Sequence, residues 1–526
     1  MPITPTYPGI YIEELPSNAH TIAAAPTSIA VFVGYTHPFK TKPSNIGNAV
    51  EVFSFTDYER EFGGFAQSAA IDSNVAYAVN QFFLNGGTDA YVVALQATDY
   101  TDATNASVGS VAAGTATVDS IVFTALEPTD TIPINVKIDN VQGSSNEIAD
   151  VTLAYGSQSE TFRKVNLTSS SSDFIETRIN GNSQLVTVGP GVAGPPPTYP
   201  AAFTTPPVAP TDITVTLPAN TVGTFQVGDF TPVFQQDSSL DKVSIFNLLI
   251  VPGVVNNGVL SEALAFCERK QAFLIMDPPK IDVADQTTDW IGTFLDGGDS
   301  AGNIAPRSTN GAVYFPYIKS TDPSTGAAIE LPPSGAVAGI YARTDTNRGV
   351  WKAPAGLEAL VKNTTGVVDT GRMTDLMQGK LNVAGIDCLR TFPGVGTVVF
   401  GARTLVGQTF NTAFQQWRYV PVRRMALFLE QTLYRNLGWA VFEPNDLPLW
   451  VAIRTSIEGF MLTLFHQGAF QGATPSQAFQ VKCDATTTTQ QDIDNGIVNI
   501  IVAFAPLKPA EFVIIKIAQL AGQAQS

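Results

Sequence analysis

Apolar runs and a helical segment alternate in the first hundred residues, in an order that few folds accommodate. Residues 28–35 (SIAVFVGY) and 89–95 (DAYVVAL) are short runs rich in β-branched and aromatic side chains. Between them, residues 71–87 place Val75, Val79 and the phenylalanines that follow at helical spacing, and two glycines end the segment. Strand, helix and strand joined by short links predict a βαβ unit in a parallel α/β sheet.

The same pattern returns much later in the chain. Further strands are expected at residues 244–253, 271–279, 311–317 and 380–389, with a helix at 261–270. Because both stretches have the same alternation, we expect them to build one sheet. The sequence therefore predicts a discontinuous α/β domain made of residues 26–100 and 236–395.

Residues 101–235 have a different character. They are rich in Thr, Ser, Val and Gly, with short alternating segments such as INVKI and VTLAY. Residues 190–210 carry eight prolines, which is typical of a stiff loop. This stretch is predicted to be an acidic, mostly β insertion on the outside of the molecule.

The last part of the chain predicts an α+β domain over residues 396–507. Residues 423–439 and 448–470 are two amphipathic helices, the second with an apolar stripe that begins at Trp450. Residues 478–506 are expected to form a hairpin, with Asn495–Gly496 favouring the turn.

Both ends of the chain carry strand-forming sequence outside these bodies. Residues 1–25 contain four prolines that forbid a helix, and between two of them lies GIYIEEL; residues 508–526 begin with KPAEFVIIKIAQL. An isolated strand is not stable alone. Each end therefore either pairs with a neighbouring copy by strand addition or folds back on its own domain.

The charge balance excludes several classes of protein. The formal net charge is −17, which argues against nucleic-acid binding and against a polybasic membrane anchor. The longest apolar runs, residues 245–255 and 497–506, are shorter than the roughly 20 residues of a membrane span. We expect no membrane insertion and, from the first residues, no secretory signal. Charged residues are only 14%, below the roughly 25% of soluble domains, which is typical of a protein packed against its own copies and also of some β-rich secreted proteins.

A search for catalytic and metal-binding patterns yields little. HExxH, GxSxG and Walker A sequences are absent, and the chain has 3 histidines. Residues 189–194 (GPGVAG) match a dinucleotide-binding spacing, but prolines follow in place of a helix. We therefore expect no enzyme activity, no cofactor and no metal.

Four weaker candidates each have a simpler structural alternative. Asp492, Asp494 and Gly496 could form a calcium loop, or they could be turn residues; Asp277, Asp282 and Asp285 could form a carboxylate cluster, or they could lie on a solvated loop. Cys267 could be a reactive thiol or a buried small hydrophobic residue. His466 could be catalytic, or it could pack or cap the end of a helix. In each case the structural alternative is favoured. The three cysteines, Cys267, Cys388 and Cys483, are far apart and predict no disulfide framework.

Seven long motifs, in order along the chain, carry a family resemblance. They are YPGIYIEELPS with TIAAAPTSIAVFVG, DTNRGVWKAPAG (345–356), LNVAGIDCLRTFPGVGTVVFGARTL (381–405), WRYVPVRR (417–424), WAVFEPNDLPLW (439–450), GATPSQAFQVKCD (472–484) and QQDIDNGIVNIIVAFAPLKPAEFVIIKI (490–517). The chain resembles contractile tail sheath proteins of phage tails, R-type pyocins and phage-like extracellular injection systems. Residues 101–235 match no such motif.

The resemblance implies a structural sheath subunit with a subtilisin-like α/β core and extended arms at both ends. Sheath subunits stack as hexameric rings around an inner tube and contract to drive it through a target envelope. The implied partners are copies of this chain, the inner tube protein, and baseplate and terminal cap proteins. The implied setting is assembly in the bacterial cytoplasm as part of a phage tail or tail-like particle, which in some systems is released.

The resemblance also assigns roles to residues. The arms, residues 7–15 and 510–518, would link neighbouring subunits, and the hairpin 478–506 would receive them. The linking residues are Ile10, Tyr11, Ile12, Glu13, Phe512, Val513, Ile514 and Ile515. We further propose that Arg418, Arg423, Arg424, Arg435 and Arg454 face the tube, the alternative being ordinary surface or intersubunit pairs. A hydrolase on the α/β core and a monomeric adhesin using the β insertion remain the competing classes.

Overall fold

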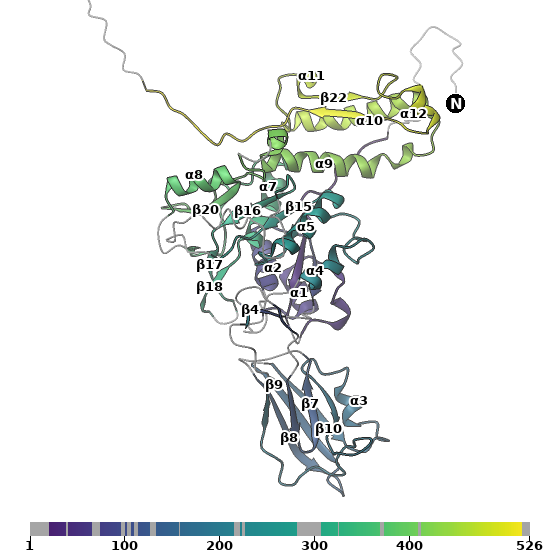
Figure 1. The fold of residues 1–526 in the computed structure, drawn as a ribbon, viewed down its shortest axis with the longest axis vertical. Coiled ribbons are helices and arrows are strands. Elements are labelled where there is room, and N and C mark those ends of the chain that lie inside the picture. The colour runs from purple at the N-terminus through teal and green to yellow at the C-terminus, as the bar shows by residue number, and fades with distance from the viewer. Residues whose placement is uncertain are drawn as a thin grey trace, which may run out of the picture. The chain divides into compact units, whose positions relative to one another are not determined.

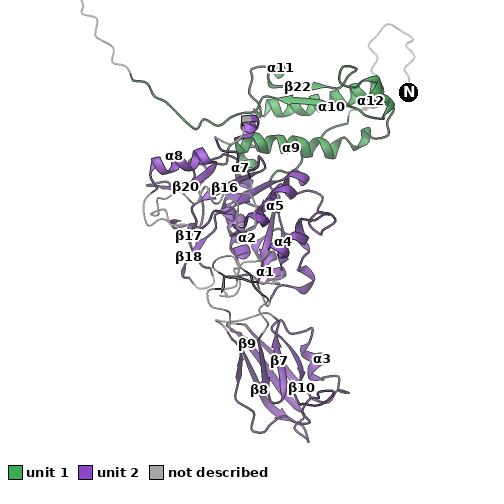
Figure 2. Cartoon of the chain, viewed as in Figure 1, with its two compact units in different colours: residues 1–27, 344–353, 419–526 green, residues 28–343, 354–418 purple. Residues whose placement is uncertain are grey.

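The computed structural model describes residues 20–37, 40–65, 74–95, 100–102, 107–109, 114–126, 133–156, 158–214, 221–222, 227–280, 307–323, 326–368, 373–408 and 412–517. The chain divides into two compact units (Figure 2). One comprises residues 1–27, 344–353 and 419–526, and the other residues 28–343 and 354–418. Each unit is described by itself.

An eight-stranded sheet forms the centre of the larger unit (Figure 1). Its strands, in spatial order, are β2 (Ala49–Val52), β3 (Ala90–Leu95), β1 (Ala30–Tyr35), β14 (Leu248–Ile250), β15 (Phe273–Met276), β16 (Gly311–Phe315), β20 (Ile386–Phe392) and β21 (Gly396–Val399). The strands from β3 to β20 are parallel, and the two edge strands are antiparallel. Strand β1 pairs with both β3 and β14, so the prediction of one sheet on both sides of the insertion is confirmed.

Helices α1 (Phe55–Phe62), α2 (Asn74–Asn85), α4 (Val227–Phe234), α5 (Asn257–Lys270), α7 (Ser334–Arg348) and α8 (Asp375–Ala384) belong wholly or mostly to this unit. The predicted helices at 71–87 and 261–270 are confirmed as α2 and α5. Cys267 on α5 is fully buried in the main core, as predicted. Helix α4 packs Phe230 and Phe234 into the same core, although its residues lie inside the stretch predicted as the outer insertion.

The strand predicted at 380–389 is half wrong. Helix α8 runs to Ala384, and strand β20 begins only at Ile386. Gly385 between them has φ 88°, and a Cβ there would lie 2.8 Å from the carbonyl oxygen of Thr404. The tight turn at this glycine ends the helix, and the apolar run across it hides the change of element.

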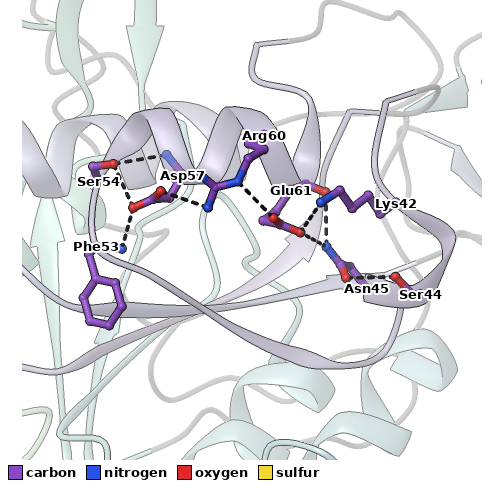
Figure 3. Close-up of polar contacts among 8 residues, drawn as sticks. All are labelled: Lys42, Ser44, Asn45, Phe53, Ser54, Asp57, Arg60 and Glu61. Carbon is purple, nitrogen blue, oxygen red and sulfur yellow. Dashed lines mark hydrogen bonds and ion pairs between the residues drawn. The ribbon is translucent and has the colours of Figure 1, made fainter.

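Polar capping fixes helix α1 (Figure 3). Ser54 Oγ accepts a hydrogen bond from the Asp57 amide at 3.1 Å, and Asp57 pairs with Arg60 at 3.0 Å. Further along the helix, Lys42 Nζ lies 2.8 Å from Glu61. That contact is the main cause that lowers the pKa of Glu61 to about 2. These exposed pairs satisfy the helix end and its flanking loop, so we assign them a structural role.

Two sheets with their own core lie within residues 115–213. One has the order β10 (Gln158–Asn166), β9 (Ile148–Tyr155), β8 (Ile134–Gln142) and β12 (Thr211–Ile213), and the other β11 (Val186–Pro190), β7 (Ile121–Ala125) and β6 (Thr115–Val118). A short helix, α3 (Ile175–Ile179), accompanies them. Burial alternates along β9, and its inward side chains join a hydrophobic cluster distinct from the main core.

Smaller elements complete this unit. They are β4 (Tyr100–Asp102) between β13 (Thr221–Val222) and β5 (Ser107–Gly109), β17 (Ile318–Thr321) between β18 (Ala328–Leu331) and β19 (Gly366–Val367), and the 3-10 turns η1 (Pro43–Asn45) and η3 (Thr412–Trp417). Strand β21 begins at Gly396, where the sequence placed the start of the last domain, and it pairs with β20 in the large sheet.

The other unit contains two long helices and a two-stranded sheet. Its elements are α9 (Val420–Asn436), the 3-10 turn η4 (Gly438–Ala440), α10 (Leu447–His466), α11 (Pro475–Ala478), β22 (Phe479–Lys482), α12 (Gln490–Asp494) and β23 (Ile501–Phe504). The two predicted amphipathic helices are confirmed. The stripe that begins at Trp450 is buried. By length and composition alone α10 could cross a membrane, a property that core helices of soluble proteins share.

The predicted hairpin is confirmed as the β22–β23 pair, but the turn prediction is wrong. Asn495 follows helix α12, and Gly496, at φ 71°, comes directly after it. Asp492 belongs to a capping box in which its carboxylate accepts from the Thr489 amide at 2.8 Å. The residues proposed as a calcium loop therefore form and end a short helix.

Candidate assembly surface

The two-stranded sheet β22–β23 is the first part of the candidate surface. The strands run antiparallel, with Phe479 opposite Phe504 and Lys482 opposite Ile501. Their inward side chains, Phe479, Val481, Val502 and Phe504, belong to or pack against the hydrophobic cluster that contains the buried stripe of α10. Because side chains alternate along a strand, Gln480, Lys482, Ile501 and Ala503 lie on the opposite face.

This sheet is short for one that stands by itself. Within the described part of the chain, β22 and β23 form a sheet of two strands, and each strand has 4 residues. A two-stranded ribbon is marginal, and packing on α10 supports only one of its faces. The outer edge of β23 meets no third strand among the described residues. Such an edge is a template for pairing with another strand.

The C-terminal segment, residues 511–517 (EFVIIKI), is the second part. It has no regular secondary structure in the isolated chain, so the strand predicted here is not formed among its described residues. Its apolar side chains are exposed, from 74% at Phe512 to 93% at Ile517. The Tyr419 hydroxyl donates to Glu511 at 3.2 Å, near the start of the segment. Consecutive large apolar side chains left in water indicate a surface that is covered in an assembly.

The N-terminal side is described only from residue 20, so the predicted linking residues Ile10, Tyr11, Ile12 and Glu13 lie outside the described residues. Residues 20–27 lie on helix α9. Asn436 accepts from the Ala23 amide at 3.0 Å and donates to the Ala23 carbonyl at 2.9 Å. Thr432 accepts from the Ala25 amide at 3.1 Å, and His20 stacks on Trp439 with ring centroids 3.8 Å apart. This part of the predicted arm therefore belongs to the folded body.

The five arginines predicted to face the tube have different environments. Arg424 is buried, with only 4% of its side chain exposed, and it pairs with Asp345, so its proposed tube-facing role is wrong. Arg423 is largely buried beside Glu430, and Arg418 is partly exposed. Arg435 is exposed, and Arg454 lies 4.0 Å from Glu458 one turn along α10. Of the five, Arg424 has the charge that is buried against a carboxylate of its own chain.

Sequence reasoning missed what surrounds Arg424. Its guanidinium donates to both carboxylate oxygens of Asp345, at 2.9 and 2.7 Å, and to the Thr27 carbonyl at 2.8 Å. The three residues come from three separate stretches of the chain, and all belong to the smaller unit. The only signal in the sequence was that both side chains occur inside family-like motifs.

Buried ionisable groups elsewhere are structural. Asp277, proposed on a solvated loop, is fully buried and accepts hydrogen bonds from the Gly253 amide and from the amide and hydroxyl of Ser334. Burial is the main cause that raises the pKa of Asp277 to about 6. The carboxylate binds the first turn of α7, where the helix dipole favours a negative charge. Asp282 and Asp285 lie outside the described residues.

The remaining candidates do not assemble into a catalytic or metal site. Burial raises the pKa of the Cys267 and Cys388 thiols, so neither is an activated nucleophile. His466 is exposed at the end of α10, with its ring centroid 5.7 Å from that of Phe465, and His37 is buried. In the described stretches no three His, Cys, Asp or Glu side chains are placed to hold a metal ion.

Comparison with known proteins gives the family. The phage tail sheath protein central domain matches residues 239–405, and the phage tail sheath C-terminal domain matches residues 412–519. The chain belongs to the phage tail sheath protein family. The family is one of structural sheath proteins, and the chain has their mixed α/β fold.

A putative prophage major tail sheath protein of Pseudomonas aeruginosa is 25% identical over 287 residues, which is 52% of this chain and 65% of that protein. The contracted helical sheath of the anti-feeding prophage has a TM-score of 0.58 at 23% identity, with 98% of this chain and 100% of that chain covered. The contracted sheath of the PVC extracellular contractile injection system has a TM-score of 0.57 at 22% identity, with 98% of each chain covered. These two likenesses show a shared fold over nearly the whole chain.

Proposed function

We propose that this chain polymerises as stacked hexameric rings around an inner tube and contracts to drive that tube through a target envelope. One observation carries the proposal: among its described residues, the chain has both a sheet edge without a third strand and an apolar segment of strand-forming residues left in water. Each is unfavourable in the isolated chain, and each would be satisfied by the other in a neighbouring copy. Relatives solved as sheaths support this use of the fold.

The physical basis of the link is strand addition. Residues 511–517 would supply backbone hydrogen bonds, each contributing about 1 kcal/mol, and large apolar side chains, each contributing about 1.5–3 kcal/mol when fully buried. Ordering the segment opposes part of this gain. A link of backbone hydrogen bonds tolerates changes in the angle between subunits, so rigid bodies can repack while the chain ends hold them together.

We propose the following division of labour. Residues 26–100 and 236–395, together with α4 and β21, form the sheath body, and the rest of 101–235 is an outer insertion. The remainder of 396–507 is the inner domain that receives the arms, and the arms are 1–25, which is bound to α9 from residue 20, and 508–526. Three separate hydrophobic clusters support three bodies. The parallel sheet with its helices supports the finer prediction of a subtilisin-like core, which stays a prediction.

The partners beyond the sheath itself would be the inner tube protein and the baseplate and terminal cap proteins. Contact with the tube must be weak enough to release on contraction. We retain Arg418, Arg423, Arg435 and Arg454 as candidate tube-facing cations in an acidic chain. Assembly in the bacterial cytoplasm, with release of the particle in some systems, completes the proposal.

Electron microscopy of the purified chain, with and without tube protein, tests the proposal. Wild-type protein is expected to form rings or tubes. Removal of residues 1–15, or Ile514→Pro, is expected to leave a folded subunit that does not polymerise, because proline removes a ladder donor. Ile514→Val is the matched control, since it keeps the donor and the β preference. Long, normal tubes from both altered chains would contradict the proposal, as would a strictly monomeric wild type.

A further inference from the structure

The C-terminal segment is longer than the ladder that would receive it. Strand β23 has 4 residues, Ile501–Phe504, whereas the exposed apolar segment covers residues 511–517. At about 3.3 Å per residue, three residues of the segment, or about 10 Å, would extend past the end of β23. The overhanging residues require an apolar surface of their own.

A surface of this kind includes the α9–α10 loop. Four exposed apolar residues are here called the loop patch: Val441 and Phe442 in the loop, Leu447 at the start of α10 and Ile497 after α12. Phe442 is the most exposed of them, at 103% of its reference surface, and its backbone has φ 71°. A phenylalanine in the left-handed region is strained, and strain of this kind persists only where the surrounding structure imposes it.

The loop is held in place by hydrogen bonds on both sides of Phe442. The Val441 amide donates to the Gly438 carbonyl at 3.3 Å. Asn445 accepts from the Trp450 indole nitrogen at 2.8 Å and donates to the Ile497 carbonyl at 3.0 Å. The phenylalanine is therefore presented to solvent by an ordered loop.

The bond from Asn445 to Ile497 also places the loop patch at one end of the candidate ladder. Ile497 lies four residues before Ile501, the first residue of β23. A strand running antiparallel to β23 would pass Phe504 first, then Ile501, and would then reach the loop patch. The direction in which the C-terminal segment runs along β23 depends on which end of the segment fits the loop patch.

Charge and side-chain alternation both favour the C-terminal end of the segment as the end that meets the loop patch. The loop carries Glu443 and Asp446, and no lysine or arginine occurs between Arg435 and Arg454. The segment has its lysine, Lys516, at its far end. Antiparallel pairing with Val513 opposite Val502 places Val513, Ile515 and Ile517 on the same face as Val498, Ile500 and Val502, which pack on the α10 cluster.

We propose that the loop patch receives residues 515–517 of the C-terminal segment of a second copy, whose residues 511–514 pair antiparallel with β23. This deepens the proposed function and rests on it. The loop patch covers Ile515 and Ile517, and the acidic loop attracts Lys516. The strained Phe442 is a preformed contact for the overhanging end.

The first test uses Phe442→Asn in the full chain, because asparagine tolerates the left-handed backbone while removing the ring. The concentration required for assembly should rise roughly 10-fold or more, with the thermal midpoint of the unassembled subunit unchanged. Leu376→Asn, at a side chain 75% exposed on α8, is the control and should assemble normally. Wild-type assembly by Phe442→Asn, while Ile514→Pro fails to assemble, would overturn the loop proposal and leave strand addition intact.

The second test locates the partner directly. A photocrosslinking benzoylphenylalanine at position 442, irradiated in assembled sheath and analysed by mass spectrometry, should join residues 515–517 of another copy. Crosslinks to residues 1–19, to a different protein or to none would overturn the proposal. Lys516→Glu and Glu443→Lys should each weaken assembly, and the double variant should recover it; no recovery would remove the charge argument.

Discussion

The buried pair of Arg424 and Asp345 gives the sharpest test of how the smaller unit is held together. Their side chains are 4% and 3% exposed, and the guanidinium makes three hydrogen bonds to Asp345 and Thr27. Arg424→Ala leaves the Asp345 carboxylate buried without its partner. Breaking a buried pair in this way costs about 3–5 kcal/mol. We expect the unit that contains α9 and α10 to lose stability by that amount.

Fluorescence-monitored unfolding in denaturant measures the effect, because Trp351, Trp439 and Trp450 all belong to or pack against the core of this unit. The chain has more than one unit, so the transition of this core is followed separately. Arg435→Ala is the matched control, since Arg435 is exposed on the same helix. The control should change the free energy of unfolding by less than about 1 kcal/mol.

Two results would refute this reasoning. Equal destabilisation by Arg424→Ala and Arg435→Ala would show that burial of the pair is not what matters. A large loss of stability in the double variant Arg424→Met with Asp345→Leu would count against the charge argument, because replacing both partners by apolar groups of similar size is often close to neutral. Thr27 would keep its backbone carbonyl in that variant.

Three further predictions follow from buried contacts. Because the pKa of Asp277 is raised to about 6 in the folded state, its contribution to stability is fully present below its unfolded pKa of about 3.8 and is lost as pH rises through about 6. The thermal midpoint of the wild type minus that of Asp277→Asn should therefore fall between pH 4 and 7; a difference that does not change with pH would contradict this. Asn436→Ala removes both bonds to Ala23 and should increase hydrogen exchange in residues 20–27, with a loss of about 1–2 kcal/mol, whereas unchanged exchange would show that α9 does not hold them. Replacing residues 114–214 by a flexible linker should spare assembly seen by electron microscopy, because that β body has its own core, and a failure to assemble would make the insertion structural.

Local pattern was sufficient where an element depends on its own sequence. Strand β1 and helices α2, α5, α9 and α10 were predictable because apolar spacing separates period 2 from period 3.6. Prediction from local pattern failed at Gly385 and at Asn495–Gly496. There the positive φ that lets glycine form a hairpin turn instead ends a helix. Turn residues specify backbone angles, and the neighbouring elements decide which turn uses them.

The features of the candidate surface likewise separate into those that the sequence predicts and those that depend on tertiary structure. Sequence alone determined that a hairpin lies near the C-terminus, and it predicts strand-forming chain ends, since β-branched runs and prolines act locally. Only the tertiary structure decided that residues 20–27 are bound to α9, that Arg424 is an interior charge and that Phe442 projects from an ordered loop. Those facts depend on Asn436, Asp345 and Ile497, which are distant in sequence. Burial and pairing are properties of the packed chain, and no short stretch of residues carries them.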